Sequence, residues 1–280
     1  MKTITIDNDT LTVPSRWGEL TTEQVLTLAR LVGQNVSYFN ISVRYCLYLL
    51  GLKPRLYPPI MVDGESLYYV KGRNKKNKYL LSTTQVHAIG KSFDWLFKRS
   101  YTENTVSIAL NPLLTSNVVK DIKIRFSTLR GPEDVLGNIS WAEFVFAETF
   151  LARYNTTGDP KWLAQFMATL WRPLRKGARI SFDQSKVEQH ARRTIRIKPH
   201  VALAAIWFYN GCKEFLSKEY PRPFSAAGGG KSRDPFKGYM DLTVTLARAD
   251  ATKAEKVLEA NLHFTLKSLD MMIQANEKKK

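Results

Sequence analysis

Few stretches of this sequence carry residues whose type and spacing could perform chemistry, and the most suggestive is glycine-rich. Residues 225–232 read SAAGGGKS and end in Gly-Lys-Ser, as a phosphate-binding loop does. Such a loop needs a glycine at its first position, a buried strand before it and a helix after it. Here Ser225 takes the first position, and the preceding YPRPF has two prolines, which a central strand does not tolerate. We therefore predict a flexible linker, with no nucleotide or other cofactor.

Residues suited to catalysis are also poorly placed. Glu143 and Glu148 lie five positions apart on one predicted helix, so they do not share a face. The four histidines are scattered singly without a second ligand one helical turn away, and there is no Gly-x-Ser-x-Gly motif. Cys46 and Cys212 stand in apolar helical contexts, where cysteine packs as a small hydrophobic residue. We predict no catalytic residue, no metal site and no enzymatic activity.

The charge is the most unusual bulk property. The 280 residues include 42 Lys and Arg against 25 Asp and Glu, a formal net charge of +17. A field of this sign attracts nucleic acid, anionic surfaces or an acidic protein. The alternative is a set of ordinary solvated lysines and arginines on helix faces.

The densest basic segment, residues 172–198, holds nine cations and two acids. If a helix runs from residue 184 to residue 197, then Gln189, Arg192, Arg193 and Arg196 share one face. Such a face suits phosphates or an acidic partner, although arginine stems packed on tryptophan would give the same pattern. Phe182 is the only aromatic residue there, and binding to single-stranded nucleic acid needs several aromatic rings for stacking. Arg192, Arg193 and Arg196 are therefore predicted to bind a protein partner, with nucleic acid as the alternative.

Two hairpins are predicted near the N-terminus. The segments TITID and TLTVP alternate in hydrophobicity around an Asn-Asp turn. Strands at 66–70 and 79–81 flank KGRNKKNK, which has five cations and no acid. This second tip is either an anion-binding finger or a solubilising edge. We predict a second partner contact there, through Arg73, Lys75 and Lys76.

Capping boxes indicate where several helices begin. In each, a serine or threonine is followed three residues later by Gln or Glu, so that the two residues satisfy free backbone N–H groups. The boxes are Thr21/Gln24, Ser82/Gln85 and Ser140/Glu143. The second helix is expected to reach about Arg99, and the third has aromatic residues on most sides and should be buried. Asp159-Pro160 and Pro199 mark two further helix starts, because proline fits the first turn.

These elements define the expected fold, which is mainly α with small β-hairpins, an α+β protein with a helical C-terminal half. We expect an α+β region at 1–130 and a helical region at 131–280, with a flexible glycine-rich linker near 222–238. The helices that carry Trp141 and Trp162 should form the core of the second region. No apolar run approaches the length of a membrane span.

Four segments together carry a family resemblance. They are WGELTTEQ, LNPLL, GPEDVLGNISWAEFVFAETFLARYNTTGD and FMATLWRPLRKG, in this order along the chain. In these segments the chain resembles proteins encoded in the tail-gene clusters of phages and prophages of Bacteroidetes-type bacteria. The similarity spans nearly the whole chain and is clearest over residues 131–176.

The resemblance implies a non-enzymatic role in building a phage tail, as an assembly chaperone or as a minor virion component. It implies that the partners are other tail or virion proteins and that the protein works in the host cytoplasm or in the virion. The family has no assigned active-site residues to transfer to this chain. The alternative function is that of a basic nucleic-acid-binding protein, and the oligomeric state stays open.

Overall fold

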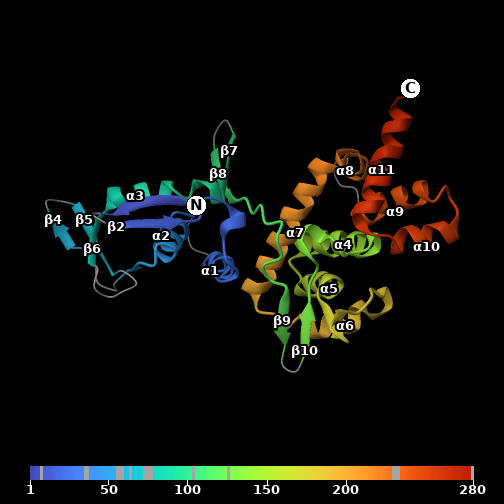
Figure 1. Ribbon diagram of the computed structural model, residues 1–280, viewed down its shortest axis with the longest axis horizontal. Coiled ribbons are helices and arrows are strands. Elements are labelled where there is room, and N and C mark those ends of the chain that lie inside the picture. The colour runs from blue at the N-terminus through green and yellow to red at the C-terminus, as the bar shows by residue number, and fades with distance from the viewer. Residues whose placement is uncertain are drawn as a thin grey trace. The chain divides into compact units, whose positions relative to one another are not determined.

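The computed structural model describes the chain except residues 7–8, 35–37, 55–59, 63–64, 72–77, 103–104, 125–126, 229–233 and 279–280. It is an α+β protein that divides into two compact units, Met1–Pro112 and Leu113–Lys280 (Figure 1). The division lies before the expected boundary at residues 130–131. The reason is that β10 (Ser127–Arg130) pairs with β11 (Arg172–Arg175), which ties the preceding segment to the second unit.

The first unit begins with the predicted hairpin. Strand β1 (Lys2–Ile6) pairs antiparallel with β2 (Asp9–Val13) from Lys2↔Val13 to Ile6↔Asp9, which confirms the alternating pattern. Ile6 and Val13 bury their side chains. The other elements of this unit are η1 (Trp17–Glu19), α1 (Thr22–Val32), α2 (Tyr38–Leu49), β3 (Lys53–Pro54), β4 (Ile60–Val62), β5 (Glu65–Lys71), β6 (Lys78–Ser82), α3 (Thr83–Lys91), η2 (Asp94–Leu96), β7 (Phe97–Thr102) and β8 (Thr105–Leu110).

The second predicted hairpin is present, and the unit contains further antiparallel strand pairs that the sequence did not indicate. Strands β5 and β6 pair as expected. Helix α3, however, ends at Lys91 and not near Arg99, and β7 and β8 form an additional hairpin. Gly90 weakens the end of α3. Phe93 precedes and Leu96 ends the 3-10 turn that follows α3, and both side chains are buried there. Their spacing resembles that of a helix face, although neither residue is part of α3.

The second unit is largely helical. Its elements are β9 (Asp121–Ile124), β10, η3 (Asp134–Leu136), α4 (Trp141–Thr157), α5 (Pro160–Leu170), β11, β12 (Ala178–Arg179), η4 (Gln184–Lys186), α6 (Val187–Thr194), α7 (Pro199–Glu219), α8 (Pro221–Gly228), α9 (Pro235–Leu246), α10 (Ala251–Glu259) and α11 (Leu262–Glu277). Helices α4 and α5 pack against each other (Figure 1). A small antiparallel sheet in the order β12-β11-β10-β9 completes the unit.

The predicted helix starts are confirmed. All three capping boxes form, with both reciprocal hydrogen bonds present at α1, α3 and α4. Asp159 caps α5, and prolines occupy the first turns of α5 and α7. Local backbone chemistry therefore places the helices that later position the charged residues.

The expected flexible linker at 222–238 is wrong over most of its length. Residues 221–228 form α8 and residues 235–238 begin α9, while residues 229–233 lie outside the described part of the chain. The prolines that suggested a linker instead occupy the first turn of each helix, where a missing N–H costs nothing. Phe224 on α8 anchors the helix by packing edge-on against Phe144 at 6.1 Å.

Trp141 lies at the centre of the second unit, as predicted. Its side chain is fully buried, its Nε1 donates a 2.8 Å hydrogen bond to Thr243 Oγ1, and its ring stacks on Phe144 at 5.6 Å. Tyr239 meets both rings edge-on. Helix α5 also contributes to this core, but its Trp162 is only half-buried.

Three glycines of the second unit allow backbone or ring atoms to approach closely. One is Gly238 on α9, where a Cβ would lie 2.5 Å from the carbonyl oxygen of Ala227. A Cβ at Gly211 on α7 would lie 2.3 Å from the carbonyl oxygen of Leu114. A Cβ at Gly131 would lie 2.4 Å from the indole nitrogen of Trp171, whose Nε1 donates to Val119 O at 2.8 Å. None of the three positions has space for a side chain.

Both cysteines are buried, one in each unit, as their apolar contexts predicted. Burial raises the pKa of the Cys46 thiol on α2 well above its usual range, and raises that of Cys212 on α7 to about 12. We expect neither thiol to react with a disulfide reagent at pH 8 in the native protein, because thiolate is the reactive form. Both should react in denaturant, and rapid labelling of the native chain would contradict the buried placement.

Candidate functional site

The first candidate surface is the arginine face, which consists of Arg192, Arg193 and Arg196. The predicted helix over 184–197 is divided into η4 and the shorter α6, which ends at Thr194. Val187, Ala191 and Thr194 turn inward, and the three arginines are exposed. All three arginines lie on the surface, but Arg196 follows the end of α6, so the single helical face expected over 184–197 is wrong for this residue.

Helix α6 is attached to α5 through its buried side, and the arginines do not contribute to this packing. Val187 and Ala191 pack against Ala164 and Ala168 of α5. Thr194 Oγ1 donates a 2.6 Å hydrogen bond to Ala164 O. None of the three arginines forms an ion pair with any residue that the structure describes. The charges of the arginine face are thus available to a partner.

The other predicted partner contact, at Arg73, Lys75 and Lys76, lies outside the described residues. Its role stays a prediction. Helix α8 begins at Pro221 and includes Ser225 to Gly228 of the glycine-rich segment, so a helix stands where a phosphate-binding loop requires a preceding strand.

The second candidate surface is a groove of about 1270 Å³ in the second unit. It runs along one face of the β12-β11-β10-β9 sheet and past the first turn of α4 and the end of α10. Residues 130–134, 138–140 and 177–182 form most of its lining, together with Glu143 and Arg172.

Strand register places three arginines on the groove side of the sheet. Arg130 lies directly opposite Arg172, and Leu174 lies opposite Arg179. Residues in opposite positions share a face, as do residues two apart on one strand. We call Arg130, Arg172 and Arg179 the sheet wall. Arg130 pairs with Asp121 next to it on β9, whereas Arg172 and Arg179 reach toward α4.

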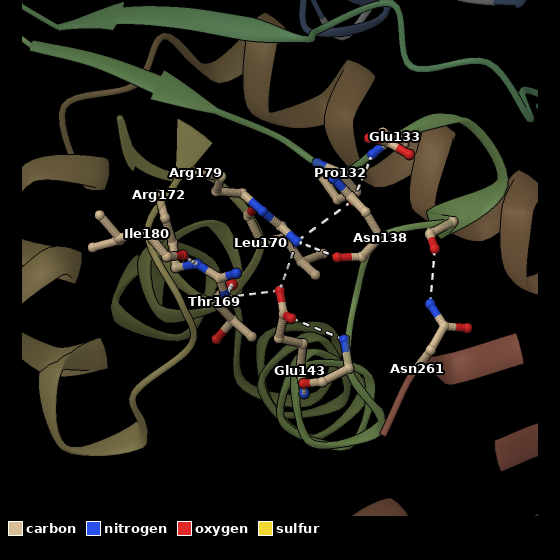
Figure 2. Close-up of polar contacts among 12 residues, drawn as sticks. Pro132, Glu133, Asn138, Glu143, Thr169, Leu170, Arg172, Arg179, Ile180 and Asn261 are labelled. Carbon is tan, nitrogen blue, oxygen red and sulfur yellow. Dashed lines mark hydrogen bonds and ion pairs between the residues drawn. The ribbon is translucent and has the colours of Figure 1, made fainter. Parts of the chain in front are cut away.

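Arg172 and Arg179 converge on a single carboxylate (Figure 2). Glu143 Oε1 lies 2.7 Å from Arg172 Nη1 and 3.1 Å from Arg179 Nη2, and the three side chains are only 4–7% exposed. Glu143 Oε2 accepts from the backbone N–H of Ser140 in the capping box. Both contacts at Oε1 are therefore close ion pairs between buried charged groups.

Backbone carbonyls hold the two guanidiniums in place. Arg172 donates to Ile180 O and Thr169 O, each at 2.9 Å. Arg179 donates to Leu170 O at 2.9 Å and to Asn138 O at 2.7 Å. The arginines are therefore fixed parts of the groove floor.

Burial lowers the pKa of both guanidiniums, and Glu143 partly offsets this effect. The pKa of Arg179 falls to about 10, with the charge of Arg172 contributing, and that of Arg172 is also lowered. An arginine side chain is not deprotonated in proteins at neutral pH, so both side chains carry a positive charge. Two cations thus share one anion at the floor of the groove.

Sequence reasoning missed this cluster. Arg172 and Arg179 counted as part of an exposed basic segment, and Glu143 only as a cap. The structure buries all three side chains. No sequence signal marked the cluster, because Arg172 and Leu174, one charged and one apolar, share a face of the strand and so break the alternation that identifies a half-buried strand.

Glu148, the second acid of α4, has a separate partner. It is 6% exposed and pairs with Lys213 Nζ. The two glutamates therefore do not form a carboxylate pair. Within the described residues, no three His, Cys, Asp or Glu side chains gather as a metal site would require, and no helix has the length and hydrophobicity to cross a bilayer.

No protein-family model matches this chain, and no curated protein or solved structure does so either.

Proposed function

We propose that this chain is a non-enzymatic protein that takes part in phage tail assembly, or forms a minor part of the virion, through protein–protein contacts. The observation that carries the proposal is the arginine face, where three exposed guanidiniums have no ion-pair partner among the described residues. The tail setting rests on the family resemblance of residues 131–176 and the three other segments.

An acidic protein surface suits this face better than nucleic acid does. Phe182, the one aromatic residue of the segment, packs against Phe146 at 5.7 Å and lies under Arg172. Its ring is therefore engaged in internal packing and does not offer a platform for bases. Exposed guanidiniums on and just after a short helix suit carboxylates, which they bind in bidentate fashion.

The test is the triple variant Arg192→Glu, Arg193→Glu and Arg196→Glu. We expect it to lose co-purification with its protein partner from induced or infected cells and to lose tail assembly. Its melting temperature should stay close to that of the unaltered chain, because exposed charges contribute little to stability. Pull-down with mass spectrometry of bound protein and nucleic acid measures the first effect.

A matched control reverses three exposed lysines elsewhere in the same unit, namely Lys237, Lys256 and Lys267. It makes the same change in net charge and should keep the partner. If the arginine variant instead loses DNA retention and its salt dependence flattens, the nucleic-acid alternative is supported. If the arginine variant keeps every partner and assembles normally, the arginine face is only a solvent-exposed surface and the proposal is wrong.

A further inference from the structure

The groove has two sides of opposite charge. The sheet wall supplies three arginines, against which stand Asp121 and Glu143, and the exposed Lys120 next to Asp121 is a further cation of the lining. The other side, which we call the acidic rim, carries Glu133, Asp134 and Glu259, all exposed. The fold would be stable without the exposed acids of the rim, because exposed charges contribute little to stability. The arrangement therefore suggests a ligand with charges of both signs.

The sheet wall has unused capacity to bind an anion. Arg172 and Arg179 share the one carboxylate of Glu143, so two positive charges face a single negative charge. No described residue accepts a hydrogen bond from Arg172 Nη2, although Arg172 lines the groove. A ligand carboxylate at this point would supply the second negative charge and accept charge-assisted hydrogen bonds.

The acidic rim offers the complementary interaction. Glu133 and Glu259 form no ion pair within the described part of the chain, and Asp134 accepts only the backbone N–H of Asn117, at 2.8 Å. A cationic side chain would be attracted there, whereas a polyanion such as nucleic acid would be repelled.

The size of the groove favours a chain segment over a small molecule. Small-ligand pockets usually measure roughly 300–1,000 Å³, and this groove holds about 1270 Å³. Its lining mixes polar side chains with backbone and apolar groups such as Ile180 and Phe182. An extended peptide can use all of these along its length.

We propose that the groove binds an extended peptide segment of a partner protein in which a carboxylate lies close to a cationic side chain. The carboxylate meets Arg172 and Arg179, and the cation meets Glu133 and Glu259. This binding site lies apart from the arginine face and does not depend on the proposed tail function.

A library of random dodecapeptides, selected on the purified full chain, tests the proposal. Enriched peptides are synthesised with a fluorescent label, and their Kd is measured by fluorescence polarisation. We expect them to carry Asp, Glu or a free C-terminus within a few positions of Lys or Arg. Neutralising the carboxylate, by Glu→Gln for a side chain or by amidation for a terminus, should weaken binding about tenfold or more. The two changes show which carboxylate is bound.

Variants at exposed groove positions avoid disturbing the buried cluster. Ser181→Trp should block the groove and abolish binding, and Glu259→Lys should weaken it about tenfold, since both residues are exposed. The triple arginine-face variant is the control and should bind the peptides as the unaltered chain does. The proposal is overturned if selection shows no preference for carboxylates, or if Ser181→Trp and Glu259→Lys leave Kd unchanged.

Discussion

Trp141→Ala should lower the free energy of unfolding of the second unit by about 3–5 kcal/mol, the usual cost of truncating a buried large aromatic. The residue loses its stacking on Phe144 and its hydrogen bond to Thr243, and a cavity remains in their place. The total free energy of unfolding of a domain is only roughly 5–15 kcal/mol. We therefore expect insoluble protein, or a loosely packed state that binds a hydrophobic dye and has lost its near-ultraviolet circular dichroism.

Trp162→Ala provides the matched control, because it makes the same exchange on the neighbouring helix. Trp162 is half-buried, stacks on Phe150 at 6.2 Å and has the guanidinium of Arg153 4.7 Å above its ring. Its loss should cost about 1–2 kcal/mol. Equal urea midpoints for the two variants would show that Trp141 is not the centre of the core.

Glu143→Gln is expected to destabilise the second unit by about 3–5 kcal/mol, since it leaves two buried guanidiniums without their counterion. Glutamine can still form the capping box, so the exchange removes the charge and keeps the cap. Urea denaturation followed by tryptophan fluorescence measures the change.

Two controls separate the contributions of Glu143. Ser140→Ala removes the cap alone and should cost about 1 kcal/mol. Glu148→Gln makes the same exchange on the same helix, but its partner Lys213 is 38% exposed and can turn to water, so the loss should be smaller. If Glu143→Gln unfolds at the same urea concentration as the unaltered chain, backbone carbonyls alone satisfy Arg172 and Arg179.

Local signals predicted much of the fold. Thr21, Ser82 and Ser140 each begin a helix because a cap satisfies backbone donors within a few residues, whatever the rest of the chain does. Pro160 and Pro199 act in the same local way. The first hairpin follows from alternation around a turn.

Signals with two structural meanings were misread. The prolines of 221–235 fit a linker as well as they fit first helical turns, and only packing decides, as Phe224 does against Phe144. Phe93 and Leu96 have helical spacing, yet their burial belongs to a turn that precedes a hairpin. In both places tertiary contacts override the local pattern.

The groove could not be predicted because its parts are distant in sequence. Glu143 lies on a helix, whereas Arg172 and Arg179 lie on two short strands whose register brings them onto one face. Nothing in the spacing of these residues encodes that register. The arginine face, in contrast, was found because one short segment of chain carries it.

Close-approach glycines limit how this chain can diverge, as Gly211 and Gly131 illustrate. At Gly211 any other amino acid would collide with the backbone of Leu114, which no rotamer can avoid, and at Gly131 it would collide with the Trp171 ring. Surface charges and most apolar residues can be exchanged gradually over evolutionary time, but these positions cannot. A distant descendant of the same ancestor should therefore retain glycine at both positions, with an indole about forty residues after the first, long after its overall sequence identity has fallen below recognition.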